Sequence, residues 1–172
     1  VSVYDGSSWD SVGTGFPSNT TINALTFYNG KLYAGGDATL GSSTEALFSL
    51  DSGNWTPRII RYVSGSDYVV NAMAVYQGKL YMGGPRLATW NDTTETYNNL
   101  LSFVSSSGIY SMVVYGGYLY IAGTFSWGGA IPVNNIVRWN GSSFDSVGTG
   151  TNGAIYKLKV MNGELYAGGS FT

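Results

Sequence analysis

The sequence predicts an all-β fold built from four similar units, and three features lead to this prediction. A tight turn followed by a short strand that closes on glycine occurs four times, at 29–36, 77–84, 116–123 and 162–169. The leucine inside each copy recurs after 48, 39 and 46 residues, at Leu32, Leu80, Leu119 and Leu165. Aromatic residues make up 15% of the chain and glycine occurs 25 times, which suits short strands joined by tight turns. Strand repeats of about 40 to 50 residues are typical of propeller blades.

Each unit is expected to contain four antiparallel strands in the same order. In the second unit the strands are predicted at 70–76, 79–84, 87–90 and 97–103. The first of these, the inner strand, aligns across the four units at 22–28, 70–76, 109–115 and 155–161. The sequence therefore predicts a β-propeller of four-stranded antiparallel blades.

The inner strands carry apolar or small side chains on both faces. One face holds Leu25, Met73, Met112 and Leu158 together with Phe27, Val75, Val114 and Val160. The other face holds small residues such as Ala24, Ala72 and Ser111. A strand of this kind is expected to be buried on both sides, as where blades stack face to face. The fourth copy differs, because Lys157 and Lys159 indicate an exposed surface or a wet channel.

Each third strand is predicted to end in an acidic or amide turn, which is followed by an aromatic residue. The turns are Asp5-Gly6, Asp51-Ser52, Asn91-Asp92 and Asn140-Gly141, and the aromatic residues are Trp9, Trp55, Tyr97 and Phe144. Asp and Asn followed by Gly favour hairpin turns, because both residues tolerate positive φ. Four tryptophans, at 9, 55, 90 and 139, are predicted to occupy equivalent strand positions. Packing between blades is their expected role, and stacking on sugar rings is the alternative.

The loop before the third strand varies most in length. It is long at 37–45 and 124–134, whereas Pro85-Arg86 suffices in the second unit. Loops of this kind open on one rim of a propeller and commonly carry binding. The candidate contacts to a partner or a glycan are therefore Asp37, Glu45, Phe125 and above all Trp127, which lies outside the repeat pattern.

The two ends of the chain are predicted to belong to one blade. Val3-Tyr4-Asp5-Gly6 matches the end of a third strand, while the last residues follow a second strand. The stretch 6–15 also recurs as 141–150 with a single change, Trp9 to Phe144. We therefore expect a single propeller domain over 1–172, with repeat units at about 1–36, 37–84, 85–123 and 124–172. Three arrangements stay open, namely a closed four-bladed ring, part of a larger ring, and a ring or filament closed between chains by exchange of terminal strands.

The repeated order of Gly-Lys-Leu-Tyr-x-Gly-Gly, a variable loop, a strand ending in Asp and then an aromatic residue resembles the kelch repeat and related prokaryotic propeller repeats. The resemblance covers essentially all of the chain as four units, with Ala122 interrupting the glycine pair of the third. It implies a bladed β architecture and says almost nothing about activity.

Composition excludes several classes of function. The chain contains neither histidine nor cysteine, so the usual general base, the usual transition-metal ligands and disulfides are absent. Its net charge of −2, with 10% charged residues, provides no basic face for nucleic acid. No apolar run is long enough for a membrane span. We expect no enzyme activity, no cofactor and no metal site.

A surface rich in Ser, Thr and Asn is commoner on secreted proteins, so an extracellular or cell-surface location is expected. Four sequons would allow N-glycosylation there, at Asn19, Asn54, Asn91 and Asn140. The sequence thus predicts a non-catalytic scaffold or interaction module that binds a protein partner. One candidate partner is a second copy of the chain, in an oligomer or a filament. The alternative is a carbohydrate-binding propeller lectin.

Overall fold

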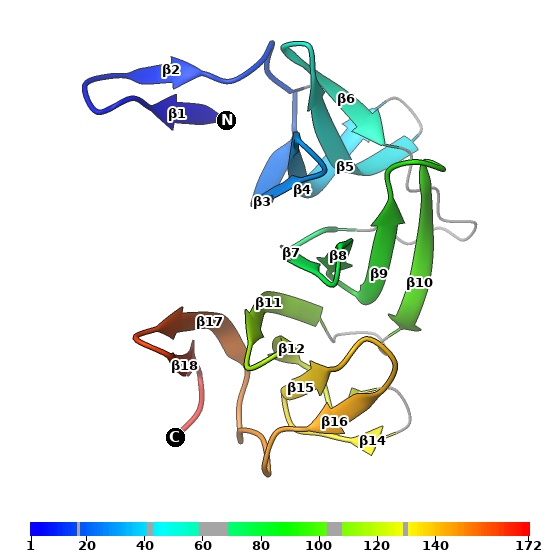
Figure 1. Cartoon of the computed structure of the whole chain (residues 1–172), viewed down its shortest axis with the longest axis vertical. Coiled ribbons are helices and arrows are strands. Elements are labelled where there is room, and N and C mark those ends of the chain that lie inside the picture. Colours follow the sequence, from blue (N-terminus) through cyan, green and yellow to red (C-terminus); the bar gives the residue numbers. More distant parts are fainter. Residues whose placement is uncertain (17, 41–42, 59–68, 103–107, 129–130) are drawn as a thin grey trace. The chain divides into compact units, whose positions relative to one another are not determined.

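The computed structural model describes residues 1–16, 18–40, 43–58, 69–102, 108–128 and 131–172 (Figure 1). Within those ranges the chain forms eighteen strands and no helix, so the all-β prediction is confirmed. The same ranges contain no helix of a length and hydropathy suited to crossing a membrane. The chain divides into two compact units, Val1–Val70 and Asn71–Thr172, and each is described by itself.

The first unit consists of a hairpin and a four-stranded sheet. The hairpin pairs β1 (Ser2–Tyr4) with β2 (Trp9–Ser11). The sheet contains the next four strands in sequence order, each antiparallel to its neighbour. These strands are β3 (Thr21–Tyr28), β4 (Lys31–Leu40), β5 (Ser43–Asp51) and β6 (Asn54–Arg58).

The second unit contains two complete sheets and two hairpins. The first sheet consists of β7 (Ala72–Tyr76), β8 (Lys79–Gly83), β9 (Arg86–Asn91) and β10 (Thr96–Ser102). The second sheet consists of β11 (Gly108–Tyr115), β12 (Tyr118–Thr124), β15 (Ile136–Trp139) and β16 (Phe144–Ser146). The hairpins are β13 (Trp127–Gly128) with β14 (Ile131–Pro132), and β17 (Ile155–Met161) with β18 (Glu164–Gly169). Three sheets have the predicted order of four antiparallel strands, which is consistent with a propeller-like fold, whereas β17 and β18 form a two-stranded sheet.

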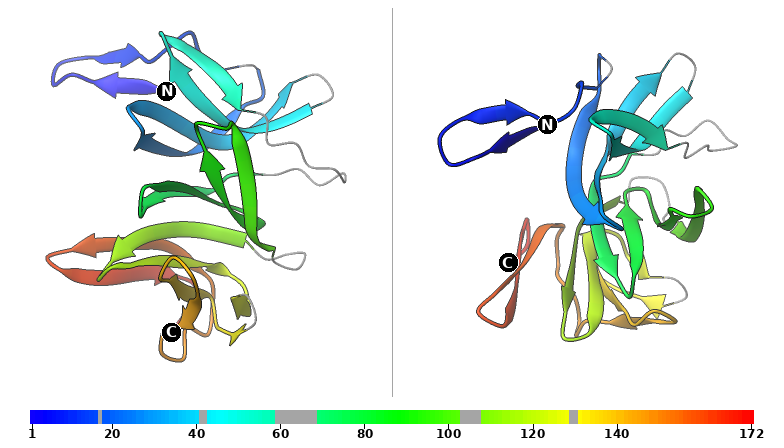
Figure 2. Two further views of the ribbon diagram at one scale, coloured as in Figure 1. Left: turned by 45° about the vertical axis from the view of Figure 1, so that its right-hand side comes forward. Right: turned by 45° about the horizontal axis from the view of Figure 1, so that its top comes forward.

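Within the second unit, β11 lies between β7 and β17. Figure 2 shows β17 beside β11. The Tyr76 hydroxyl donates to the carbonyl oxygen of Gly117 at 2.7 Å, and the Trp139 indole donates to the Tyr81 hydroxyl at 3.1 Å. On the other side of β11, the backbone N–H of Leu158 donates to the buried Ser111 hydroxyl at 2.9 Å. The sheets of this unit therefore stack face to face around their inner strands. Their shared core contains Leu87, Ile109, Leu119, Ile121 and Val137, all fully buried.

The prediction that both faces of the inner strands are buried is wrong for part of each strand. Phe27, Val75 and Val114 occupy one repeat position, next to the last residue of the strand, and all three are exposed. The alternation of β3 also leaves Leu25 exposed within its unit. A prediction of burial that uses only the apolar character of the residues is therefore too high where these strands reach the turn. Lys157 and Lys159 of β17 are exposed, as their charge predicted.

The second glycine of the repeated motif fits against the inner strand of its own sheet. Gly36, Gly123 and Gly169 lie opposite Ile22, Ile109 and Ile155, next to an irregularity in the ladder. A Cβ atom at any of the three would collide with a backbone carbonyl oxygen of the inner strand. The motif therefore needs glycine for close backbone approach, as the role in packing predicts.

The acidic or amide turns are held by the side chain of their first residue. Asp5 Oδ1 accepts backbone N–H groups of Ser7 and Ser8 at 2.7 and 2.8 Å. Asn140 Oδ1 accepts those of Ser142 and Ser143, both at 2.8 Å. The two hairpins thus have the same turn, in which the side chain replaces a backbone acceptor. Because its carboxylate accepts these hydrogen bonds, the pKa of Asp5 falls to about 2.

Both long loops predicted before third strands contain strands instead. Residues 37–40 extend β4 and 43–45 begin β5, with Ala38 opposite Glu45 and Leu40 opposite Ser43. Residues 124–134 include the β13–β14 hairpin, in which Trp127 pairs with Pro132. The alternation of polar and apolar residues continues past the glycines in both places, so extended strands pair there.

One partly buried ion pair lies at the end of β5. Arg58 Nη2 lies 2.6 Å from Asp51 Oδ2, and the buried Ser49 hydroxyl donates to the same oxygen at 2.6 Å. The hydrogen bond from Ser49 is the main cause that lowers the pKa of Asp51, and Lys31 and Arg58 add to it against the effect of burial.

This arrangement predicts a pH-dependent loss of stability. A carboxyl whose pKa is lowered by folding stabilises the fold above its unfolded value of about 3.9, and the contribution disappears as pH falls through the folded value. We expect Asp51→Asn to lower the free energy of unfolding at pH 7 by about 1–2 kcal/mol. The difference from the wild type should shrink below pH 4. Urea denaturation at pH 7 and pH 2.5 measures it, and a difference that is unchanged at pH 2.5 would contradict the assignment.

Candidate functional site

Two of the four predicted contact residues lie in the first unit and two in the second. Asp37 is half-buried in β4 opposite Thr21. Glu45 lies in β5 opposite Ala38, and its side chain lies outside the part of the chain that the structure describes. Phe125 is buried in the core of the second unit, and its contact with a partner stays a prediction. Trp127 lies in β13, and its side chain is also outside the described part.

The repeated tryptophans fall into two positions, so the prediction of one equivalent position is wrong. Trp90 and Trp139 end third strands, opposite Leu80 and Leu119. Trp9 and Trp55 begin fourth strands, opposite Tyr4 and Leu50. Trp55, Trp90 and Trp139 are buried and cannot stack on a sugar, whereas Trp9 is 72% exposed.

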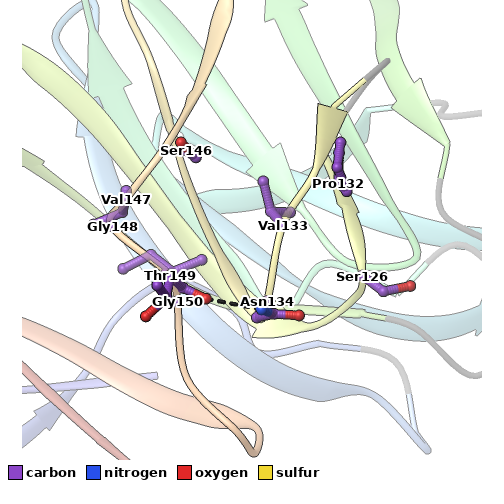
Figure 3. Close-up of a pocket in the computed structure, with 10 residues that line it drawn as sticks. Ser126, Pro132, Val133, Asn134, Ser146, Val147, Gly148, Thr149 and Gly150 are labelled. Atoms are coloured by element: carbon purple, nitrogen blue, oxygen red, sulfur yellow. Dashed lines mark hydrogen bonds between the residues drawn. The ribbon is translucent and has the colours of Figure 1, made fainter.

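A cavity of about 570 Å³ lies beside the β13–β14 hairpin of the second unit (Figure 3). One wall is the segment Val147–Gly150, and the other contains Ser126, Pro132, Val133 and Asn134. The Asn134 amide donates to the carbonyl oxygen of Thr149 at 2.8 Å and joins the two walls at one end. Two of the lining residues, Ile136 and Val147, also take part in the cluster that buries Ile155 and Leu158 of β17. The cavity is therefore partly apolar, and its lining shares residues with the packing of β17.

The β17–β18 hairpin exposes a residue that every complete sheet buries. Tyr166 of β18 is 45% exposed. At the same motif position the exposed fractions are 0%, 2% and 9% for Tyr33, Tyr81 and Tyr120. Within the described residues β18 pairs with β17 alone, whereas β12 pairs on both sides. The exposed aromatic side chain therefore coincides with an unpaired strand edge.

Polar chemistry in the described residues is sparse. These residues contain no group of three Asp or Glu side chains that could hold a metal ion. Arg138 lies 4.4 Å from the ring centre of Tyr118 and 3.6 Å from Asp145, and its pKa is raised chiefly by a hydrogen bond with Tyr120. The guanidinium of Arg138 therefore interacts with side chains of its own sheet, on β12 and β16.

All four sequon asparagines lie in turns or at strand ends. Asn19, Asn54 and Asn91 are exposed, and Asn140 is half-buried with its amide donating to the Ser143 hydroxyl at 2.9 Å. Their glycosylation stays a prediction.

Comparison with known proteins identifies a fold and no family. No family model matches the chain, and no curated protein matches it. Among solved structures it is similar to the computationally designed Ika4 protein (TM-score 0.58, 14% identity), with 94% of this chain and 92% of that chain covered. It is also similar to the extracellular domain of BT4673 from B. thetaiotaomicron (0.59, 12%) and to the WD40 repeats of RRP9 (0.52, 16%). Those matches cover 95% and 81% of this chain, which spans 28% and 42% of the longer proteins.

Sequence reasoning did not identify the cavity or the exposed Tyr166. The signal was present, because the cavity wall 147–150 repeats the sequence of 12–15. Only the structure shows that Trp55 packs against Gly13 in the first copy, whereas nothing lies within 4 Å of a Cβ at Gly148 in the second.

Proposed function

We propose that the chain is a non-catalytic, extracellular propeller domain that acts as an interaction scaffold and associates with itself. The exposure of Tyr166 beside an unpaired strand edge carries this proposal. Unpaired edges recruit further strands, and exposed aromatic residues contribute much of the energy of protein interfaces. In this proposal the four repeat units, at about 1–36, 37–84, 85–123 and 124–172, form one domain.

Three further observations support the proposal. The low charge and the many hydroxyl side chains suit an extracellular surface. The similar structures include an extracellular domain and WD40 repeats, an analogy at the level of fold. The absence of histidine and cysteine from the chain favours binding over catalysis.

Light scattering of the 172-residue chain after size exclusion tests this function. We expect the mass to rise above that of one chain with concentration, because exposed apolar edges associate. Tyr166→Ala should reduce the association, whereas Tyr156→Ala is a matched control on the same hairpin. Tyr156 and its counterpart Tyr110 in a complete sheet are both exposed, so exposure at this position does not require an open strand edge.

Two results would contradict the proposal. A mass of one chain at every concentration argues against self-association. Turnover in a screen of glycosidase and esterase substrates argues against a non-catalytic role.

A further inference from the structure

We propose that β18 and the cavity beside Val147–Gly148 form one docking site for the β1–β2 hairpin of a second copy. This inference rests on the proposed function and specifies the surfaces that meet. In it, β1 adds to the free edge of β18, and the Trp9 side chain enters the cavity. The result is a complete four-stranded sheet made from two chains.

The complete sheet β11-β12-β15-β16 defines the strand register of this junction. There, β12 and β15 pair Leu119 with Trp139, Tyr120 with Arg138, and Ile121 with Val137. The repeat aligns β18 with β12, and the β1–β2 hairpin has the same pairing and turn as β15–β16. The junction therefore pairs Tyr4 with Leu165, Val3 with Tyr166, and Ser2 with Ala167.

The first unit shows how a segment of this sequence receives a tryptophan. The Trp55 indole donates to the carbonyl oxygen of Val12 at 2.8 Å, and its ring stacks on Phe16 with centroids 4.7 Å apart. Gly13 gives it room, because a Cβ there would lie 2.8 Å from the indole nitrogen. Trp55 is only 8% exposed as a result.

The second unit contains the same segment, but no tryptophan side chain packs against it at Gly148. Val147 and Gly148 repeat Val12 and Gly13, yet a Cβ at Gly148 would meet nothing within 4 Å. The residue expected to pack against Val147 and Gly148 is the one that has the position of Trp55 in a fourth strand. In the β1–β2 hairpin that residue is Trp9, which is 72% exposed. In this proposal the cavity of about 570 Å³ receives the indole of Trp9 and is called the indole seat. The acceptor of the indole N–H is the carbonyl oxygen of Val147, which also accepts the backbone N–H of Gly150 at 3.0 Å.

A second pair of surfaces becomes covered in the same junction. Leu25 of β3 is 49% exposed, whereas Met73, Met112 and Leu158 at its repeat position are buried. Within the second unit, Met112 and Tyr81 belong to one cluster between neighbouring sheets. Leu25 has the repeat position of Met112, and Tyr166 has that of Tyr81. In the junction, Leu25 of one copy therefore covers Tyr166 of the other. Both exposed residues thus have a partner of the kind found in the complete sheets.

A second copy is the assigned occupant because it carries the matching hairpin: β1–β2 pairs as β15–β16 does, and β18 corresponds to the strand β12 on which β15 adds. Each copy offers one hairpin and one acceptor edge, which is a head-to-tail contact between different surfaces. Such contacts close into a ring or extend into a filament. Strand addition to an open edge provides the backbone hydrogen bonds, and the indole seat provides the register.

Cysteine cross-linking tests the junction, and the chain has no native cysteine to interfere. Opposed residues on adjacent strands lie within the distance that a disulfide spans. We expect Ser2→Cys and Ala167→Cys chains, mixed and oxidised, to form a covalent heterodimer. Asp10→Cys mixed with Ala167→Cys is the matched control and should not, because β2 lies one strand farther from β18.

The alternative outcomes overturn the proposal in different ways. If Ser2→Cys/Ala167→Cys in one chain gives a cross-linked monomer while the mixed single variants give no heterodimer, the hairpin closes on its own chain. If neither experiment gives a cross-link, the hairpin does not pair with β18. Self-association measured by light scattering without a cross-link would leave the proposed function standing and remove this inference alone.

The indole seat has its own test. Trp9→Ala should cause loss of the dimer at concentrations where the wild type associates. Phe27→Ala is the control, because Phe27 is exposed like Trp9 but so are its repeat counterparts Val75 and Val114. An unchanged dimer in Trp9→Ala would overturn the seat, and circular dichroism shows whether both variants fold.

Discussion

Replacing Leu119 by alanine should lower the free energy of unfolding by about 2–5 kcal/mol, the usual range for a leucine in a rigid core. Leu119 is fully buried in the cluster that joins the two complete sheets of the second unit. Its loss leaves a cavity, because Ile121, Val137 and Trp139 are held by the paired strands β12 and β15. Urea denaturation followed by tryptophan fluorescence measures the change.

Leu165 is the matched control for Leu119. It occupies the same motif position in β18, where it is half-buried. For a dilute, monomeric chain, Leu165→Ala should therefore be less destabilising than Leu119→Ala. Since a second copy would bury Leu165 opposite Tyr4, its cost should rise with protein concentration. Equal losses in dilute solution would contradict the burial difference between β12 and β18.

The regular part of the fold could be predicted from the sequence because the repeat marks it four times. Inner strands predicted at 22–28, 109–115 and 155–161 are observed as β3, β11 and β17, with ends that agree to one residue. The turns were also recognisable, because Asp5 and Asn140 are the residue types whose side chains accept backbone N–H groups. These features depend on local sequence, so local patterns reveal them.

The candidate site depended on tertiary packing and was harder to predict. Phe125 lies two residues after Gly123 in a polar segment, which suggests a loop tip, yet it is buried in a core cluster against which Ile131 of β14 also packs. Residues 37–40 and 43–45 were expected in a loop, but they form strands because the pairing of β4 with β5 continues past Gly36. The alternation of polar and apolar residues past the glycines indicates extended strands there, but it does not indicate which strands pair.

The most informative residues are those whose burial departs from that of their repeat counterparts. Tyr166 and Leu25 are exposed, whereas the side chains at their repeat positions in the other copies are buried. Sequence alone treats all copies of the repeat as equal. In the structure, a residue that is exposed while its repeat counterparts are buried marks a surface that lacks a packing partner.

Replacing Gly123 by alanine should destabilise the second unit by about 1–3 kcal/mol or more, the range for an added methyl group without space. Gly123 lies opposite Ile109, where the ladder between β11 and β12 is irregular, and a Cβ would collide with the carbonyl oxygen of Gly108. Relief requires moving the β11 backbone, which lies between β7 and β17. Both neighbouring sheets therefore resist the shift, and thermal unfolding should show a lower midpoint.

Gly168 provides the matched control for Gly123 within the same motif. Nothing lies within 4 Å of a Cβ at Gly168, and its backbone is not in the left-handed region. In a dilute chain, Gly168→Ala should leave stability unchanged or raise it slightly, since alanine restricts the unfolded chain. The first glycine of the fourth copy is then dispensable for folding, while the second glycine of the third copy is required. If the two variants unfold alike, close backbone approach is not the reason for the glycine motif.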